Sequence, residues 1–333
     1  MKEVKMKEVK MKEVLVTLPL NEKQRKNLES VDNQLKFVYT KRSRATSEMV
    51  ASANIIVGNI QPELLTHGKK LELMQLDSAG VEHVTNQKVL PEGVLLTNGT
   101  GAYGEAIAEH MLGSLMTIQK KFHLYLRNMA NHEWKREGYG GSISGSTALV
   151  LGFGDIGSHF AMKMNALGSK VIGVRKNKTD CPHYLKSIHQ IEELEELLPR
   201  ADIVACSLPG TSETKHLLNK DRLKLMKRGA LLVNIGRGSL IPTEDLIWAL
   251  ESGQLGGAAI DVTEEEPLPK ESKLWSAPNL LITPHVSGLY NEPSILEKIV
   301  EIAKENIRGF LAGEELKTEV DVNAGYRKFT KTL

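Results

Sequence analysis

The chain has 333 residues, which is too long for a single ordinary hydrophobic core and predicts two domains. Its formal net charge of +2 argues against strong electrostatic attraction to nucleic acid or an anionic membrane, and no stretch is apolar for long enough to cross a bilayer. The two cysteines, Cys181 and Cys206, fit a reducing cytoplasm rather than a disulfide framework. Cys206 lies in an apolar run and is expected in the core.

The first 14 residues, MKEVKMKEVKMKEV, repeat a five-residue unit almost three times. They lack the apolar central region of a signal peptide. We interpret residues 1–12 as a poorly ordered N-terminal extension, with a short charged helix as the alternative. The folded chain is expected to begin with a buried strand at residues 13–18.

Strands and helices alternate over the next hundred residues, which predicts a parallel sheet covered by helices. We expect a helix at 21–28 and strands at 35–39, 53–57 and 71–76. Ser78, Ala79 and Gly80 follow the last of these strands. Small residues there leave backbone N–H groups available to an anion, although an ordinary β-turn is the alternative. A single long helix is expected at 105–129, because apolar residues recur along it at helical spacing.

Residues 149–175 combine an apolar strand, a glycine-rich turn, an amphipathic helix and a second strand at 170–174. Gly152, Gly154 and Gly157 have GxGxxG spacing. They permit a tight turn, close approach of a pyrophosphate and close packing of the helix on the strand. The helix directs its free N–H groups at the phosphates. In this βαβ context the motif favours dinucleotide binding over a glycine turn without a ligand.

The second strand of this unit ends in Arg175 and Lys176, where an NAD site usually carries an acidic residue for the ribose 2′-OH. A 2′-phosphate would meet cations there, so the sequence favours NADP(H) over NAD(H). The alternative is a solvated basic loop that tolerates either cofactor.

The remaining pattern predicts a doubly wound sheet of about six strands. We expect an amphipathic helix at 188–198 that is stopped by Pro199, and short helices at 223–227 and 245–251. The expected strands are 202–208, 230–235, 257–262 and 280–283.

Arg237, Glu266 and His285 each follow one of these strands, so they should lie on one edge of the sheet, where such folds bind ligands. An arginine can hold a carboxylate and polarise a carbonyl, and a histidine can supply a proton. A neighbouring glutamate would favour the imidazolium and orient it. The alternatives are a loop histidine, a solvated acidic loop and an arginine that serves only cofactor phosphates. Spacing alone leaves these choices open.

The stretch NIGRGSLIPTEDLIWALESGQLGGAAIDVTEEEPLPKESKLWSAPNLLITPHVSG resembles the signature half of the D-isomer-specific 2-hydroxyacid dehydrogenases. The resemblance extends over residues 14–313 in element order, and its motifs are most specific from 149 to 288. It implies that Arg237, Glu266 and His285 are catalytic. It also implies that backbone amides of Ser78, Ala79 and Gly80 hold the substrate carboxylate, together with Arg237.

The resemblance also implies the domain organisation and the partners. A Rossmann dinucleotide-binding domain at 104–288 would be inserted in a flavodoxin-like substrate domain at 13–103 and 289–333, to which a helix at 294–311 returns. We expect a homodimer in the cytoplasm that binds a 2-oxo or 2-hydroxy acid and no metal. The expected cofactor-binding residues are Gly152, Gly154, Asp155, Ile156, Arg175, Lys176, Leu208, Pro209, Ile235 and Asp261.

Three features of the sequence indicate which branch of the family the chain resembles. The missing acidic residue after the second strand resembles the NADPH-preferring glyoxylate and hydroxypyruvate reductases. Glu266 argues against the formate dehydrogenase branch, which has glutamine there. The length argues against a phosphoglycerate dehydrogenase with a long regulatory domain, but a short one remains possible. The alternative from another class is a nucleotide-sensing regulator, because the C-terminal-binding-protein corepressors have the same fold and triad.

Overall fold

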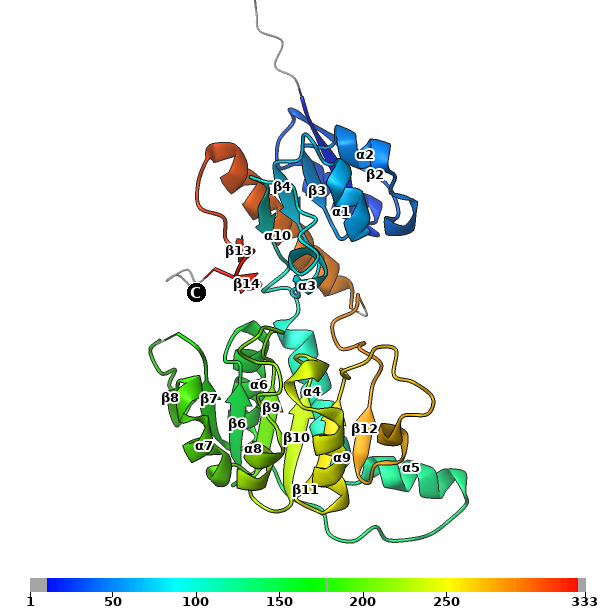
Figure 1. Cartoon of the computed structure of the whole chain (residues 1–333), viewed down its shortest axis with the longest axis vertical. Coiled ribbons are helices and arrows are strands. Elements are labelled where there is room, and N and C mark those ends of the chain that lie inside the picture. Colours follow the sequence, from blue (N-terminus) through cyan, green and yellow to red (C-terminus); the bar gives the residue numbers. More distant parts are fainter. Residues whose placement is uncertain (1–10, 178, 291, 329–333) are drawn as a thin grey trace, which may run out of the picture. The chain divides into compact units, whose positions relative to one another are not determined.

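The computed structural model describes residues 11–177, 179–290 and 292–328, so the first ten residues of the repeat lie outside the described residues, while its last part enters strand β1 (Lys12–Val16), one residue earlier than expected. These residues form two compact units (Figure 1). One comprises the chain up to residue 102 together with the segment from 292 onward. The other comprises residues 103–290. The first unit is therefore built from two separate parts of the sequence.

The first unit contains a five-stranded sheet in which every neighbouring pair is parallel. Its strand order, β2-β1-β3-β4-β5, is the flavodoxin-like doubly wound order. The strands are β1 (Lys12–Val16), β2 (Leu35–Tyr39), β3 (Ile55–Val57), β4 (Leu73–Gln75) and β5 (Leu95–Thr97). The helices are α1 (Glu22–Glu29), α2 (Ser47–Ser52), α3 (Glu82–Thr85) and α10 (Pro293–Ala312), with 3₁₀ turns at Arg42–Arg44 and Pro62–His67. A short antiparallel pair, β13 (Val320–Asp321) and β14 (Tyr326–Arg327), follows α10.

Helix α10 confirms the helix expected at 294–311, with Pro293 in its first turn. It packs against α1 and β4 of the first unit, and its apolar face, which includes Ile299 and Ile307, is fully buried. A buried polar group joins the same helix to the sheet. Asn306 donates from Nδ2 to Gln75 Oε1 at 2.7 Å and to Thr318 Oγ1 at 2.8 Å. Because these buried groups satisfy one another, they fix the helix on the sheet at one register.

The second unit contains a seven-stranded parallel sheet with the order β12-β11-β10-β9-β6-β7-β8. This is the Rossmann order with one extra strand at the β12 edge. Its strands are β6 (Thr147–Leu151), β7 (Lys170–Val174), β8 (Ser187–His189), β9 (Ile203–Cys206), β10 (Ala230–Asn234), β11 (Leu255–Ile260) and β12 (Leu280–Ile282). Its α-helices are α4 (Gly104–Gln119), α5 (Phe122–Ala130), α6 (Asp155–Ala166), α7 (Leu194–Leu197), α8 (Lys220–Leu225) and α9 (Thr243–Glu251). Its 3₁₀ turns are Ile191–Glu193, Leu198–Arg200, Gly238–Leu240 and Lys273–Ser276.

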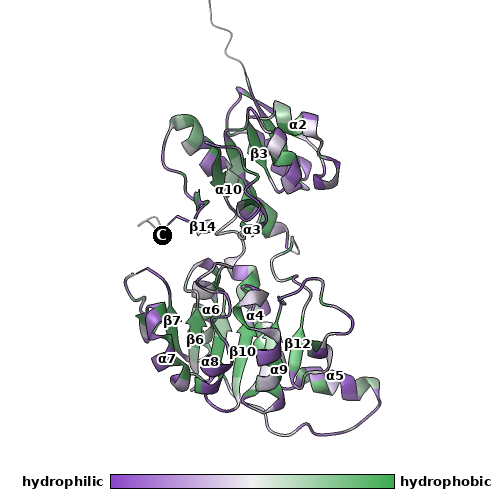
Figure 2. Cartoon of the chain, in the orientation of Figure 1, coloured by the Kyte–Doolittle hydropathy of each residue, from purple (hydrophilic) through white to green (hydrophobic). Residues whose placement is uncertain are grey.

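The strands of this sheet are buried on both faces, which explains their continuous apolar runs. Leu149 and Leu151 belong to the cluster formed with residues of α7, α8 and α9. Val150, which points to the opposite face, lies beneath Gly157 of α6. Figure 2 shows the same pattern, with hydrophobic strands and amphipathic helices. Cys206 is fully buried in β9 as expected, and burial raises the pKa of its thiol.

The single helix expected at 105–129 is wrong, because the chain breaks between α4 and α5. Lys121 adopts a left-handed backbone with φ of 59°. Helix α4 ends just before this residue, and helix α5 begins just after it. The sequence around Lys121 contains no glycine or proline that would predict this break. Both lysines at the break contact a distant segment: Lys120 Nζ donates to the carbonyl of Gly141, and Lys121 Nζ to that of Glu137.

The helix expected at 188–198 is confirmed only in part, because residues 191–200 are helical but the expected start and end are wrong. Ile188 belongs to strand β8, which extends the sheet to seven strands rather than six. The rest of that segment is a succession of short 3₁₀ and α turns in which Pro199 is included rather than excluded. Within the described residues, no helix combines the length and the apolar character that a membrane crossing requires.

Gly157 provides a stability prediction for the second unit. A Cβ at this position would lie 2.2 Å from the carbonyl oxygen of Gly152 and 3.1 Å from Val150 Cγ1. We expect Gly157→Ala to lower the free energy of unfolding by about 1–3 kcal/mol, because α6 must move away from the strand. Gly154→Ala is the matched control, since a Cβ there meets no atom within 4 Å. Urea unfolding measures both variants, and equal midpoints would contradict this account of the helix packing.

Candidate active site

The glycine turn after β6 has the shape that a dinucleotide requires. Gly152 has φ of 95°, and a Cβ there would lie 2.9 Å from the backbone of Ser207. Gly154 is the N-cap of α6 and has open space on its Cβ side. Asp155 and Ile156 then form the first turn of a 12-residue helix whose N–H groups point toward this space. The turn therefore fits a pyrophosphate.

The loops after β9 and β10 lie against this turn. Ser207 Oγ donates to the carbonyl of Gly152 at 2.9 Å. A Cβ at Gly236 would lie 2.6 Å from the carbonyl oxygen of Leu208. The structure therefore brings the segments of Leu208–Pro209 and Ile235–Gly236 together with the glycine turn, at the carboxyl edge of the sheet. This is the edge at which doubly wound sheets bind ligands.

Arg175 and Lys176 follow β7 at the same edge. The backbone N–H of Arg175 donates to the carbonyl of His189 at 3.0 Å. Burial lowers the pKa of the Arg175 guanidinium, but an arginine stays protonated in proteins. Lys176 Nζ lies 2.7 Å from Glu213 Oε2 in an exposed ion pair. This partner, Glu213, was not anticipated from the sequence because it lies 37 positions away from Lys176.

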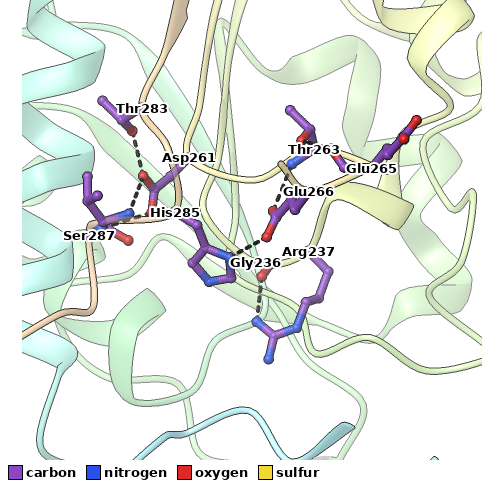
Figure 3. Close-up of polar contacts among 10 residues, drawn as sticks. Gly236, Arg237, Asp261, Thr263, Glu265, Glu266, Thr283, His285 and Ser287 are labelled. Carbon is purple, nitrogen blue, oxygen red and sulfur yellow. Dashed lines mark hydrogen bonds and ion pairs between the residues drawn. The ribbon is translucent and has the colours of Figure 1, made fainter. Parts of the chain in front are cut away.

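Glu266 and His285 form the central pair of the candidate site (Figure 3). His285 Nδ1 lies 2.7 Å from Glu266 Oε2, and Glu266 Oε1 accepts from the N–H of Thr263 at 3.1 Å. An ionised carboxylate only accepts hydrogen bonds, so Nδ1 carries a proton and Nε2 is the atom that gains or releases one. The side chains are 51% and 38% exposed for His285 and Glu266, so the imidazole is accessible.

Arg237 lies at the end of the segment that follows β10. Its Nη1 donates to the carbonyl of Gly236 at 2.7 Å, and its own carbonyl accepts from Asn234 Nδ2 at 3.0 Å. Figure 3 shows its guanidinium in the same region as the imidazole of His285. A cation, an imidazole and a carboxylate therefore share one edge of the sheet, as the strand pattern predicted.

Asp261 follows β11 and is almost completely buried. Its carboxylate accepts three hydrogen bonds, from Thr283 Oγ1 at 2.6 Å and from the N–H groups of Val286 and Ser287 at 3.0 Å each. Its carbonyl also accepts from the N–H of His285 at 2.8 Å. Asp261 therefore fixes the turn that carries His285.

The segment Ser78–Gly80 follows β4 and belongs to the first unit. Its carbonyls are occupied: Ser78 accepts from Gly99 N, Ala79 from Asn98 Nδ2, and Gly80 from Ser78 Oγ, at 2.7–2.8 Å. Across residues 11–177, 179–290 and 292–328, no acceptor faces the N–H groups of Ala79 and Gly80. The segment therefore offers donors to an anion.

Asp77 precedes this segment, and burial raises the pKa of its carboxyl group. Its Oδ1 accepts from the N–H of Asn59 at 2.7 Å. Asp77 therefore links this segment to the loop after β3 through a backbone N–H group.

Sequence reasoning missed two supports of the site. His110 of α4 contacts Thr283 and hence Asp261, and Asn98 holds the carbonyl of Ala79. Both contacts join residues that are distant in sequence, so no local pattern could reveal them.

The fold and this set of side chains define a dinucleotide-dependent oxidoreductase. Residues 112–287 match the family model described as D-isomer specific 2-hydroxyacid dehydrogenase, NAD binding domain. A putative 2-hydroxyacid dehydrogenase of Haemophilus influenzae is 32% identical over 281 residues, covering 80% of this chain and 87% of that protein.

Solved structures agree with this match. A D-isomer specific 2-hydroxyacid dehydrogenase family protein of Aeromonas salmonicida superposes with a TM-score of 0.82 at 30% identity, covering 94% of this chain and 99% of that one. An NADPH-dependent glyoxylate/hydroxypyruvate reductase of Sinorhizobium meliloti, solved with NADP and sulfate, gives 0.80 at 26% identity and covers 95% and 100%. The chain belongs to the D-isomer specific 2-hydroxyacid dehydrogenase family, and it is an NAD(P)-dependent dehydrogenase.

Proposed function

We propose that this protein reduces small 2-oxo acids, of the size of glyoxylate or hydroxypyruvate, to D-2-hydroxy acids with NADPH as its preferred cofactor. The observation that carries the proposal is the 2.7 Å contact between Glu266 and His285 at the carboxyl edge of a dinucleotide-binding sheet. The Sinorhizobium meliloti reductase supports the substrate class and the cofactor.

Reduction requires a hydride at the carbonyl carbon, which a bound dihydronicotinamide supplies, and a proton at the carbonyl oxygen. In the proposed mechanism His285 donates this proton from Nε2, and recovers it when the reaction runs in reverse. Glu266 accepts from Nδ1–H throughout, which favours the imidazolium before transfer and keeps the ring oriented.

Arg237 and the turn at Ser78–Gly80 have the complementary role of holding the substrate carboxylate. The guanidinium of Arg237 offers a planar pair of donors that suits a carboxylate and polarises the adjacent carbonyl. The N–H groups of Ala79 and Gly80 provide further donors. We assign cofactor contacts to Gly152, Gly154, Asp155, Ile156, Leu208, Pro209, Ile235 and Asp261.

Steady-state assays test this proposal by following loss of the reduced-nicotinamide absorbance with glyoxylate, hydroxypyruvate, pyruvate and larger 2-oxo acids. We expect turnover of the small acids, and we expect His285→Ala to lower kcat by about 10²–10⁴-fold while NADPH still binds. The exposed His67→Ala is the control. Tight NADPH binding without turnover of any acid would instead favour a nucleotide-sensing protein, and full activity of His285→Ala would remove that residue from the mechanism.

The cofactor preference is tested separately at Arg175. The 2′-phosphate of NADPH would pair with Arg175 and would compete with Glu213 for Lys176. We expect Arg175→Asp to reduce the ratio of kcat/KM for NADPH to that for NADH by about 10–100-fold, because a charge-assisted hydrogen bond is replaced by repulsion. Lys186→Asp, an exposed charge reversal elsewhere in the same unit, is the control. An unchanged ratio would show that Arg175 does not bind the 2′-phosphate.

We also propose that two copies of the chain associate through α5. Phe122, Tyr125, Leu126 and Met129 occur at helical spacing on one exposed face of this helix, and Met129 is 69% exposed. Such a face is costly to leave in water.

Light scattering after size exclusion tests the dimer. We expect twice the chain mass for the native protein, and the mass of one chain for Leu126→Glu, because a charge would be buried at the contact. Leu225→Glu changes an exposed leucine of α8 and serves as the control. A native protein that elutes as a single chain at micromolar concentration would contradict the proposal.

A further inference from the structure

The turn at Thr283–Ser287 needs an external support, because it holds His285 in an unfavourable backbone conformation. His285 has φ of 52°, in the left-handed region that a residue with a side chain rarely adopts. The turn is held by Asp261 through its carboxylate and its carbonyl. Asp261 therefore fixes the backbone from which the imidazole projects, while Glu266 contacts the ring itself.

His110 of α4 reaches this support from another element. Its Nε2 lies 3.1 Å from Thr283 Oγ1 and 3.9 Å from Asp261 Oδ1. Helix α4 also approaches Gly288, the residue after this turn. A Cβ at Gly288 would lie 3.3 Å from Cδ1 of Ile107, which lies about one helical turn before His110 in α4. The helix packs on β10, β11 and β12, so it is a rigid base for these contacts.

The hydrogen bonds determine which nitrogen of His110 carries a proton. The hydroxyl of Thr283 has one hydrogen and gives it to Asp261 Oδ1 at 2.6 Å. Its oxygen can then only accept from His110, so Nε2 of His110 must be protonated. His110 therefore donates to Thr283, and Thr283 donates to Asp261. These two hydrogen bonds hold the Asp261 carboxylate in the plane in which it accepts from the N–H groups of Val286 and Ser287.

We propose that His110 is a positioning residue for the reaction, which acts through Thr283 and Asp261 to hold His285 in its proton-donating orientation. The proposal rests on the proposed function, since it gives His285 the role of proton donor. His110 itself contacts Thr283 rather than the imidazole, so its effect is indirect.

Nuclear magnetic resonance of histidine-labelled full-length protein tests the hydrogen-bond chain without any need for turnover. At pH 8, where an ordinary imidazole is neutral, we expect His110 to carry its proton on Nε2. We expect the isosteric variant Thr283→Val to speed amide exchange at Ser287, and Thr283→Ser, which keeps the hydroxyl, to preserve the native rate. A proton on Nδ1 of His110, or native exchange in Thr283→Val, would overturn the proposal.

Kinetics with NADPH and the best 2-oxo acid test the functional consequence. We expect Thr283→Val and His110→Leu each to lower kcat about tenfold while KM for the acid changes less than about twofold, because the substrate contacts remain. His110→Gln keeps a donor at the end of its side chain and should recover most of the loss. If the residues act in series, the double variant should lose no more than Thr283→Val alone.

Additive losses in the double variant, or no recovery with His110→Gln, would overturn the positioning role. A protein that shows the expected resonances but reduces no acid would contradict the proposed function instead, so the two failures can be distinguished.

Discussion

The parallel register of the second sheet is the constraint on which the candidate site depends. Strands β6, β9, β10, β11 and β12 run in one direction, so their carboxyl ends emerge at one edge. The glycine turn, Arg237, Glu266 and His285 all follow those ends. Residues separated by more than a hundred positions therefore share one edge without any long-range side-chain contact to bring them there. Burial of the strands between two layers of helices, which keeps the sheet in register, is the energetic basis of the site.

At this edge of the sheet, the carboxylates of Glu266 and Asp261 make different contacts, because Glu266 is partly exposed and Asp261 is buried. Glu266 is partly exposed, and its Oε2 lies 2.7 Å from Nδ1 of His285. Asp261 is buried and spends its lone pairs on backbone N–H groups and a hydroxyl. Such a carboxylate holds the turn between β12 and the residues after His285 in place. In the mechanism that we propose, a left-handed histidine on a turn held in this way would need little reorganisation before proton transfer.

In the first unit, a series of hydrogen bonds joins the C-terminal segment to the turn at Ser78–Gly80. Asn306, in the helix that returns from the end of the chain, contacts Gln75 and Thr318. Thr318 in turn donates to the carbonyl of Asn98, whose side chain holds the carbonyl of Ala79. The C-terminal segment is therefore connected through buried hydrogen bonds to the turn that offers N–H donors to an anion. This gives a physical reason for a unit built from two separate parts of the sequence.

The sequence by itself determined the α/β class, most strands of both sheets, the glycine turn and the three strand-end residues, because these depend on local patterns of apolar residues, glycines and loop chemistry. It was wrong about the continuity of the helix at 105–129 and about the start and end of the helix at 188–198, because helical periodicity does not locate a break of one or two residues or fix a helix boundary. Only the tertiary structure decided the contact of His285 with Glu266, the pairing of Lys176 with Glu213, and the chain from His110 to Asp261. Each of these joins residues from different elements, and a distance across the fold is not encoded by spacing along the chain.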